Sequence, residues 1–318
     1  MKDYLSHLDV SVGICAHNEE ANIANLLSNL LAQSLPKNFD LREIIVVASG
    51  CTDNTEEIVK KYQGLDKRIK LIIQKERCGK ASAVNLLLKE CSSQIIIMES
   101  ADTIPAPGTI GKLVRPFLDP RVEGTAARPI PINDGDSAAD HISKLIWRYL
   151  HHELSSRKCR LSGELFAIRA GIVKKIPPEI VHDDIYIQHC IEKQACKLVY
   201  VSDALVFMKG PETITDLIKQ RRKNIGGFLQ LRQYTGIREP TVSPTKTLSF
   251  LAKALLEIQH LQEFLYIMLA VILEAYAHLL ARHDIKTNSI PVGLVNYRVS
   301  STKNLSVGAY KKSLFQQE

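Results

Sequence analysis

Short apolar runs alternate with helix-like segments over roughly the first 100 residues of this 318-residue chain. Segments with leucine, isoleucine or alanine at helical spacing separate the runs. The runs, each bounded by polar residues, predict four buried strands at 10–16, 43–47, 71–73 and 95–98. This alternation predicts an α/β fold with a mostly parallel central sheet and helices on both faces.

Each predicted strand is followed by a group of polar residues. The four groups are residues 17–20, 49–53, 77–80 and 99–102. Ligands of open α/β sheets bind outside the carboxyl ends of the strands. We therefore expect the four groups to meet at one edge of the sheet and to form a binding site there.

The formal net charge of +7 fits anionic substrates or a membrane surface. Nucleic acid is not an expected partner, because no stretch combines dense Lys and Arg with interleaved aromatic residues. The seven cysteines are scattered and form no CxxC pair, which fits a reducing compartment and argues against a disulfide framework or a zinc site. No signal peptide precedes the first predicted strand, so we expect a cytoplasmic protein.

The alternation loosens after residue 105. Residues 161–168 predict a loop that leads into a strand, and 197–201 predict a further strand. Thr213 and Asp216 form a predicted capping box for a helix that runs to Lys223. We place the main domain at residues 1–238 and a C-terminal helical segment with a polar tail at 239–318, the tail carrying a strand-like piece at 292–299.

The C-terminal segment is long and apolar from residue 245 to residue 282. Within 264–281 only Glu274 and His278 interrupt the apolar run, and about 18 residues is the lower limit for crossing a bilayer. Glu274 near the middle would be costly in lipid. Three interpretations stay open: a helix pair packed on its own domain or a partner, an interfacial membrane helix, or a true span.

An acidic pair, Asp183-Asp184, precedes the basic cluster 220–223 by 36 residues. A carboxylate can take a proton from an attacking hydroxyl, and cations can hold a departing diphosphate. The alternatives are a helix N-terminus stabilised by its dipole for the pair, and a solvated helix face for the cluster. His182, His189, His151 and His152 lack metal-ligand spacing and are interpreted as surface or packing residues.

The order of these segments resembles a family 2 glycosyltransferase with the GT-A fold, over roughly residues 8–235. The matching pieces are 16–20, 46–55, 79–85, 100–103, 162–164, 183–184 and 220–223. The resemblance implies an inverting enzyme that moves a sugar from a nucleotide sugar, with UDP as the first expectation, to a lipid-linked or surface-glycan acceptor. A membrane surface is a further partner that it leaves open.

The resemblance also implies the roles of individual residues. Asp184 would be the catalytic base, and Asp183 would orient the base or the acceptor. Asp102 would bind Mg²⁺ or Mn²⁺ together with substrate phosphates. The implied donor-binding residues are His17, Asn18, Glu19, Ser49, Arg77, Lys80, Ser100 and Asp102. The residues implied at the diphosphate or the acceptor are Gly163, Glu164, Gln220, Arg221, Arg222 and Lys223.

The chain departs from the family pattern in three places. Ser49 stands where an acidic residue usually reads the base, and Ser100 replaces the first Asp of the Asp-x-Asp motif. Lys223-Asn224 replaces Arg-Trp, which argues against a long-chain polysaccharide synthase. These changes keep a second hypothesis open, a non-catalytic GT-A domain acting as a membrane-associated binding or assembly subunit. A sugar-phosphate nucleotidyltransferase is less favoured, because residues 17–20 supply no glycine-rich loop.

Overall fold

The computed structural model describes residues 7–156, 159–236, 261–287 and 305. The first part of the chain forms β1 (Leu8–Ala16), α1 (Ile23–Leu31), β2 (Phe39–Ser49), α2 (Thr55–Leu65), β3 (Ile69–Gln74), α3 (Lys80–Glu90), β4 (Ile95–Ser100) and β5 (Thr103–Pro105). The second part forms α4 (Thr109–Val114), the 3-10 helix η1 (Arg115–Leu118), β6 (Val122–Pro131), α5 (Ala138–Ser156), β7 (Leu165–Arg169), α6 (Asp183–Lys193), β8 (Lys197–Met208), α7 (Ile214–Thr235) and α9 (Leu261–Lys286).

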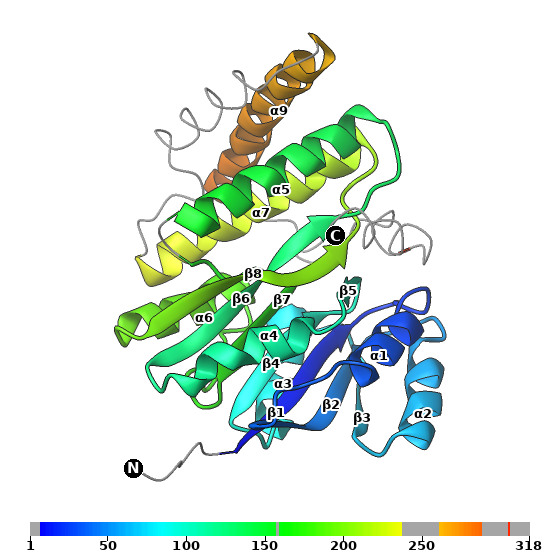
Figure 1. The fold of residues 1–318 in the computed structure, drawn as a ribbon. Helices are drawn as coiled ribbons and strands as arrows, with labels where there is room; N and C mark the ends of the chain where they lie inside the picture. The colour runs from blue at the N-terminus through cyan, green and yellow to red at the C-terminus, as the bar shows by residue number, and fades with distance from the viewer. Residues whose placement is uncertain (1–6, 157–158, 237–260, 288–304, 306–318) are drawn as a thin grey trace.

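The strands form one sheet with the order β3-β2-β1-β4-β7-β6-β8-β5 (Figure 1). The pairs β1–β2, β2–β3, β1–β4 and β6–β8 are parallel, whereas β7 runs antiparallel to both of its neighbours and β5 runs antiparallel to β8. The predicted α/β fold with a mostly parallel sheet is therefore confirmed. From β1 the chain adds β2 and β3 on one side, and β4 then pairs with β1 on the other side. The strand order therefore reverses between β1 and β4, which makes this position a topological switch point.

The alternating side chains of the central strands supply two hydrophobic cores, one on each face of the sheet. Ile44 and Val46 of β2 belong to the core that contains α1, α2 and α4, and the intervening Ile45 and Val47 belong to the core that contains α3 and α6. Gly13 of β1 permits the second core to pack closely, because a Cβ atom there would lie 2.2 Å from Leu87 Cδ1 of α3. Helices therefore cover both faces, as predicted.

A buried carboxylate joins β2 to its neighbours at the end of the sheet opposite the predicted site. Glu43 is 2% exposed and accepts hydrogen bonds from Ser11 Oγ at 2.7 Å, Lys70 Nζ at 2.5 Å and the Ser92 amide at 3.0 Å. Burial alone would raise its pKa, but these donors outweigh burial and lower the pKa of Glu43 from 4.5 to about 2.

Glu43→Gln is expected to lower the free energy of unfolding by about 3 kcal/mol at neutral pH, since the ionised form is the one stabilised in the folded state. A depressed folded-state pKa contributes stability above the unfolded value of 4.5, and that contribution is lost as the pH falls toward about 2. The difference between the two proteins should therefore shrink on acidification, to about half near pH 3. Urea unfolding at several pH values measures it, with exposed Glu76→Gln as the control. A pH-independent difference would contradict this explanation.

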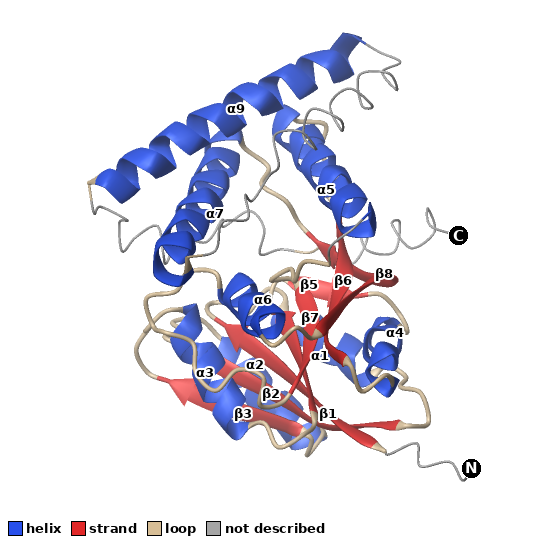
Figure 2. Ribbon diagram, turned by 90° about the vertical axis from the view of Figure 1, so that its left-hand side faces the viewer, coloured by secondary structure: helices blue, strands red, loops and turns tan. Residues whose placement is uncertain are grey.

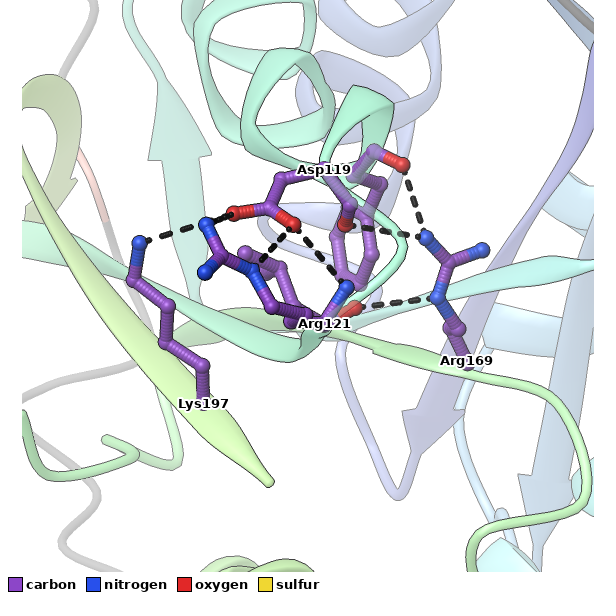
Figure 3. A network of polar contacts seen from close by, with 6 residues as sticks. Asp119, Arg121, Arg169 and Lys197 are labelled. Atoms are coloured by element: carbon purple, nitrogen blue, oxygen red, sulfur yellow. Dashed lines mark hydrogen bonds and ion pairs between the residues drawn. The ribbon is translucent and has the colours of Figure 1, made fainter.

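A second polar network fastens the loop between η1 and β6 to strand β7 (Figure 3). Asp119 accepts hydrogen bonds from the backbone amide and the Nε of Arg121, both at 3.0 Å, and lies 3.7 Å from Lys197 Nζ. Arg169 donates to the carbonyl groups of Phe117 at 2.7 Å and Val122 at 2.9 Å. Arg169 pairs with the first residue of β4, so this network lies at the amino end of that strand and away from the predicted site.

Helices α5, α7 and α9 lie beyond the sheet. Thr213 caps α7 as predicted, with its hydroxyl oxygen accepting the Asp216 amide at 3.1 Å. Helix α9 packs against α7 and α5 on the side away from the sheet (Figure 2). The domain boundary predicted at 238, the helical stretch before residue 261 and the strand-like piece at 292–299 fall outside the described residues.

Candidate active site

The polar tips that follow β1 and β2 are joined by hydrogen bonds at the carboxyl ends of these strands. His17 Nδ1 lies 2.8 Å from the Ser49 carbonyl oxygen. Asn18, which has a φ of 54°, accepts the Thr52 amide on Oδ1 at 2.8 Å. Glu19 is fully buried, and its carbonyl oxygen accepts the amide of Ile23 at 2.9 Å where α1 begins. Two of the predicted groups therefore meet at one edge of the sheet.

The Ser49 side chain is held inside this edge. Its hydroxyl donates to Gln74 Oε1 at 2.6 Å, and Gln74 Nε2 donates to Ser82 Oγ at 2.8 Å. Ser49 is 6% exposed. Arg77 lies over the same turn, because a Cβ atom on Gly50 would be 2.8 Å from the Arg77 nitrogen. Neutral side chains, linked by hydrogen bonds, therefore occupy the position where the resemblance implies an acidic residue.

A lysine and the acidic pair meet between α3 and α6. Lys80 is the first residue of α3 and Asp183 is the first residue of α6, and Lys80 Nζ lies 3.0 Å from Asp183 Oδ1. Burial alone would lower the pKa of Lys80, but Asp183 and Asp184 outweigh it and raise that pKa. The lysine side chain keeps 45% of its surface exposed, whereas that of Asp183 keeps 4%. Lys80 therefore stays charged and faces solvent beside the acidic pair.

The loop before β7 closes this group of residues. A Cβ atom on Gly163 would lie 3.6 Å from both Asp184 Oδ2 and Lys80 Nζ. The absence of a side chain at Gly163 therefore keeps room beside the carboxylate that is predicted to be the base. Residues from three separate parts of the chain, predicted as site residues on short motifs, are neighbours in the fold.

A further group of carboxyl groups lies where β4 ends. The Ser100 amide donates to the Glu164 carbonyl oxygen at 2.9 Å, and Ser100 Oγ donates to Asp102 Oδ1 at 2.6 Å. Burial raises the pKa of Glu164, and the carboxylates of Asp184 and Asp102 raise it further. Glu99 beneath them is 4% exposed, and burial raises its pKa well above the usual range. Carboxyl groups therefore gather around Asp102, and the raised pKa values of Glu99 and Glu164 favour the neutral forms of these two groups.

Among the described residues, no group of three or more His, Cys, Asp or Glu side chains is placed to hold a metal ion. The arrangement around Asp102 does fit a metal held through one protein carboxylate, because Mg²⁺ and Mn²⁺ take their other ligands from water and substrate phosphates. Ser100 orients the Asp102 carboxylate through its hydroxyl.

Arg221 and Arg222 of the basic cluster on α7 face helix α9, whereas Lys223 lies near His182. Arg221 donates two hydrogen bonds to the Glu274 carboxylate, both at 2.7 Å. Arg222 donates in the same way to Asp284, at 2.7 and 2.5 Å. Each guanidinium keeps further N–H donors. A role of these arginines at the diphosphate or the acceptor stays a prediction, as do the roles of Gln220 and Lys223 on the same helix.

Two residues near the predicted base were not assigned to the site from the sequence. His182 lies with Nδ1 3.8 Å from Asp184 Oδ1 and with Nε2 2.9 Å from the Asn224 carbonyl oxygen. Burial lowers the pKa of His182, although Asp184 opposes the shift. Burial also lowers the pKa of Arg160. The nearby Asp184 carboxylate opposes this shift but does not outweigh it. Adjacency to Asp183 was the only sequence signal for His182, and Arg160 had none.

Several known proteins are similar to this chain in sequence. The chain is 26% identical over 218 residues to poly-beta-1,6-N-acetyl-D-glucosamine synthase of Staphylococcus aureus. The match covers 65% of this chain and 52% of that protein. The chain therefore spans about half the length of the curated relatives it matches. An uncharacterized glycosyltransferase of Haemophilus influenzae is 35% identical over 105 residues, or 33% of this chain and 31% of that one.

Solved structures confirm the GT-A fold. The mannosyltransferase PcManGT from Pyrobaculum calidifontis, in complex with GDP-Man and Mn²⁺, aligns over 97% of this chain and 88% of its own, with a TM-score of 0.57 and 21% identity. Glucosyl-3-phosphoglycerate synthase from Mycobacterium tuberculosis, in complex with Mn²⁺, UDP and phosphoglyceric acid, aligns over 70% and 78%, with a TM-score of 0.51 and 20% identity. The family model "Glycosyl transferase family 2" matches residues 11–176, more than half of the 318 residues, and the chain therefore belongs to this family of glycosyltransferases.

Proposed function

We propose that this glycosyltransferase moves one sugar, with inversion, from a nucleotide sugar to a hydroxyl of a lipid-linked or glycan acceptor. The observation that carries the proposal is the meeting of Lys80, Gly163 and Asp184 at the edge of the sheet where β1 and β4 end. Charged groups of both signs lie there beside a space left open by a glycine. This is what a displacement at a sugar phosphate requires.

In the proposed reaction Asp184 takes the proton of the acceptor hydroxyl as that oxygen bonds to the anomeric carbon. The bond between this carbon and the diphosphate oxygen breaks on the opposite face, and the nucleoside diphosphate leaves with the bonding electrons. Lys80 holds Asp183 in place and adds positive charge near the leaving group. His182 stays neutral beside Asp184, because burial lowers its pKa.

The donor would lie along the strand ends. His17, Asn18 and Ser49 would border the base, and Arg77 would lie near the phosphates. Asp102 would hold Mg²⁺ or Mn²⁺, which supplies positive charge to the diphosphate when bound. Ser49 and Gln74 would offer the base neutral groups that can both donate and accept hydrogen bonds. These groups do not select one base, so the transfer assay with three nucleotides identifies the donor.

We place the site on the cytoplasmic side of the cell. The cysteines are scattered through the chain and suit a reducing compartment. The acceptor would then be a glycan precursor or lipid-linked sugar that is reached from that side.

The test is a transfer assay with the full chain, bacterial membranes as the acceptor source and radiolabelled UDP-, GDP- and dTDP-sugars, each with and without Mn²⁺. The proposal predicts that label from one nucleotide enters a solvent-extractable lipid fraction or a glycan fraction, and that Mn²⁺ is required. Donor binding without any incorporation, from a well-folded protein, would favour the non-catalytic alternative.

Gly163→Ala is expected to leave the fold intact and to lower transfer. The added methyl group would meet Asp184 and Lys80 at an ordinary contact distance of 3.6 Å, so the melting temperature should not change. The methyl would, however, take space beside the base that the acceptor hydroxyl needs. We expect kcat/KM for the acceptor to fall by about tenfold or more, which corresponds to about 1.4 kcal/mol. Gly171→Ala, at a position with open space around it but a positive φ, would instead lower the melting temperature without this kinetic effect.

A further inference from the structure

Helix α9 presents a continuous apolar face to solvent. Its exposed large apolar residues are Leu261, Phe264, Leu265, Met268, Val271, Ile272, Tyr276 and Leu279, with exposed fractions between 38% and 74%. Their spacing of three and four residues places them on one side of the helix. Figure 2 shows α9 lying across the far ends of α5 and α7, on the outside of the molecule. We call this set of side chains the outer stripe.

The opposite side of α9 is polar or small and faces the rest of the protein. Ala277 and Ala281 are fully buried against Ile225 of α7. Glu274 and Asp284 are the acceptors of the two arginine pairs from α7, and their side chains are 29% and 7% exposed. Tyr266 stacks on His141 of α5 with ring centroids 4.5 Å apart. One side of α9 is therefore packed along its length against α5 and α7 of its own domain.

The two faces decide between the ways in which α9 could meet a bilayer. By length and composition this is the one helix of the described residues that could cross a membrane, and its 26 residues extend about 39 Å. A span surrounded by lipid would have to break both arginine pairs and leave two carboxylates in hydrocarbon. A helix that lies in the plane of the interface keeps both pairs and buries the outer stripe alone.

Charge on the outer face matches an anionic surface. Arg282, His283 and Lys286 are exposed and follow Leu279 by three, four and seven residues, so they continue the outer stripe at its C-terminal end. Glu274 is directed to α7, and Glu263, eleven residues earlier, lies on the same side of the helix as Glu274. The outer stripe therefore carries cations at one end and no carboxylate.

We propose that α9 lies flat on an anionic lipid bilayer, with the outer stripe inserted among the headgroups and acyl chains. The apolar residues would enter to a depth of about 5–10 Å, and the cations would contact phosphate groups at the surface. The bidentate pairs to Arg221 and Arg222 would hold the catalytic domain in a fixed orientation on the membrane. This surface is separate from the transfer chemistry and does not depend on the donor or acceptor.

The test is flotation of the full chain with two kinds of vesicle, phosphatidylcholine alone and phosphatidylcholine mixed with phosphatidylglycerol. The wild type should float with the mixed vesicles and much less with the neutral ones. Leu265→Glu/Ile272→Glu should reduce the bound fraction by tenfold or more. Leu65→Glu is the matched control, because Leu65 is an exposed apolar residue (81%) on α2, and it should float like the wild type.

The remaining outcomes separate other occupants of the stripe. Arg282→Glu/Lys286→Glu should bring binding to mixed vesicles down to the level seen with neutral ones. Alkaline carbonate should release the protein from vesicles, and resistance to it would show a span and overturn the proposal. Failure of the wild type to float would also overturn it. If Leu265→Glu/Ile272→Glu converts a dimer into a monomer by light scattering and no vesicle binding is seen, a second copy of the chain covers the stripe instead.

Discussion

Asp184→Asn should lower the rate of sugar transfer by about 10²- to 10⁴-fold while leaving donor binding unchanged, because it removes only the proton acceptor. Asparagine has nearly the same shape and would stay beside Gly163, but it cannot take the proton of an acceptor hydroxyl. The rate loss should appear in kcat rather than in the dissociation constant of the nucleotide sugar. Radiolabel transfer and calorimetric titration of the donor measure the two quantities separately.

Asp203→Asn is the matched control for this change. Asp203 is a strand carboxylate whose side chain is 69% exposed and lies 3.7 Å from Lys112. The substitution should alter neither transfer nor donor binding. Wild-type rates in Asp184→Asn would show that another group takes the proton, and Glu164, with its raised pKa, would be the next to test.

Glu274→Leu should loosen α9 from the domain. The change would leave Arg221, whose side chain is only 17% exposed, without its carboxylate. Removing one partner of a buried ion pair costs about 3–5 kcal/mol, and because Glu274 is 29% exposed we expect about 2 kcal/mol here. Amide hydrogen exchange in 261–286 should then accelerate by about 30-fold.

A double-mutant cycle isolates the pair from other effects of the substitutions. Arg221→Met and Glu274→Leu should each speed exchange in α9, and the double variant should cost less than the sum of the two. Arg42→Met provides the control, because Arg42 pairs with Asp9 on the exposed surface of the sheet domain, and it should leave α9 unaffected. Additive effects in the cycle would mean that the contact between Arg221 and Glu274 contributes no coupling energy.

The sequence predicted the sheet domain well because its signals are local. The apolar runs that became β1, β2 and β4 are buried on both faces, whereas β3 lies at the edge of the sheet and is only partly buried. All four runs alternate with helices, and this pattern predicts parallel pairing. The tips of these strands met as expected, since parallel strands place their carboxyl ends at one edge.

The second half was harder to predict because its pairings are not local. Strand β7 joins β4 to β6 in an antiparallel arrangement, and nothing in residues 165–169 specifies these partners. Helix α5 was not predicted from the sequence, although its residue His141 stacks on Tyr266 of α9. The sequence indicated Arg221 as a candidate phosphate ligand. It could not show that Arg221 forms a bidentate pair with Glu274, which is 53 residues further along the chain.

The same pairing changes the meaning of Glu274. In the sequence it is a charge that interrupts an apolar run and argues against a membrane span. In the fold it anchors α9 to α7, so the helix packs on its own domain with one face, which is one of the three interpretations that the sequence left open. The other face is apolar and exposed, and its contact with a membrane surface stays a proposal.

The most direct test of the proposed donor site is a thermal-shift titration of the full chain with UDP-, GDP- and dTDP-sugars, with and without Mn²⁺, for the wild type and Asp102→Asn. A ligand that binds only the folded state raises the melting temperature. We expect one nucleotide sugar to raise it in the wild type only when Mn²⁺ is present, and Asp102→Asn to lose that metal-dependent part. Equal shifts with and without Mn²⁺ in both proteins, or no shift with any donor, would contradict the account of a metal-held nucleotide sugar at the strand ends.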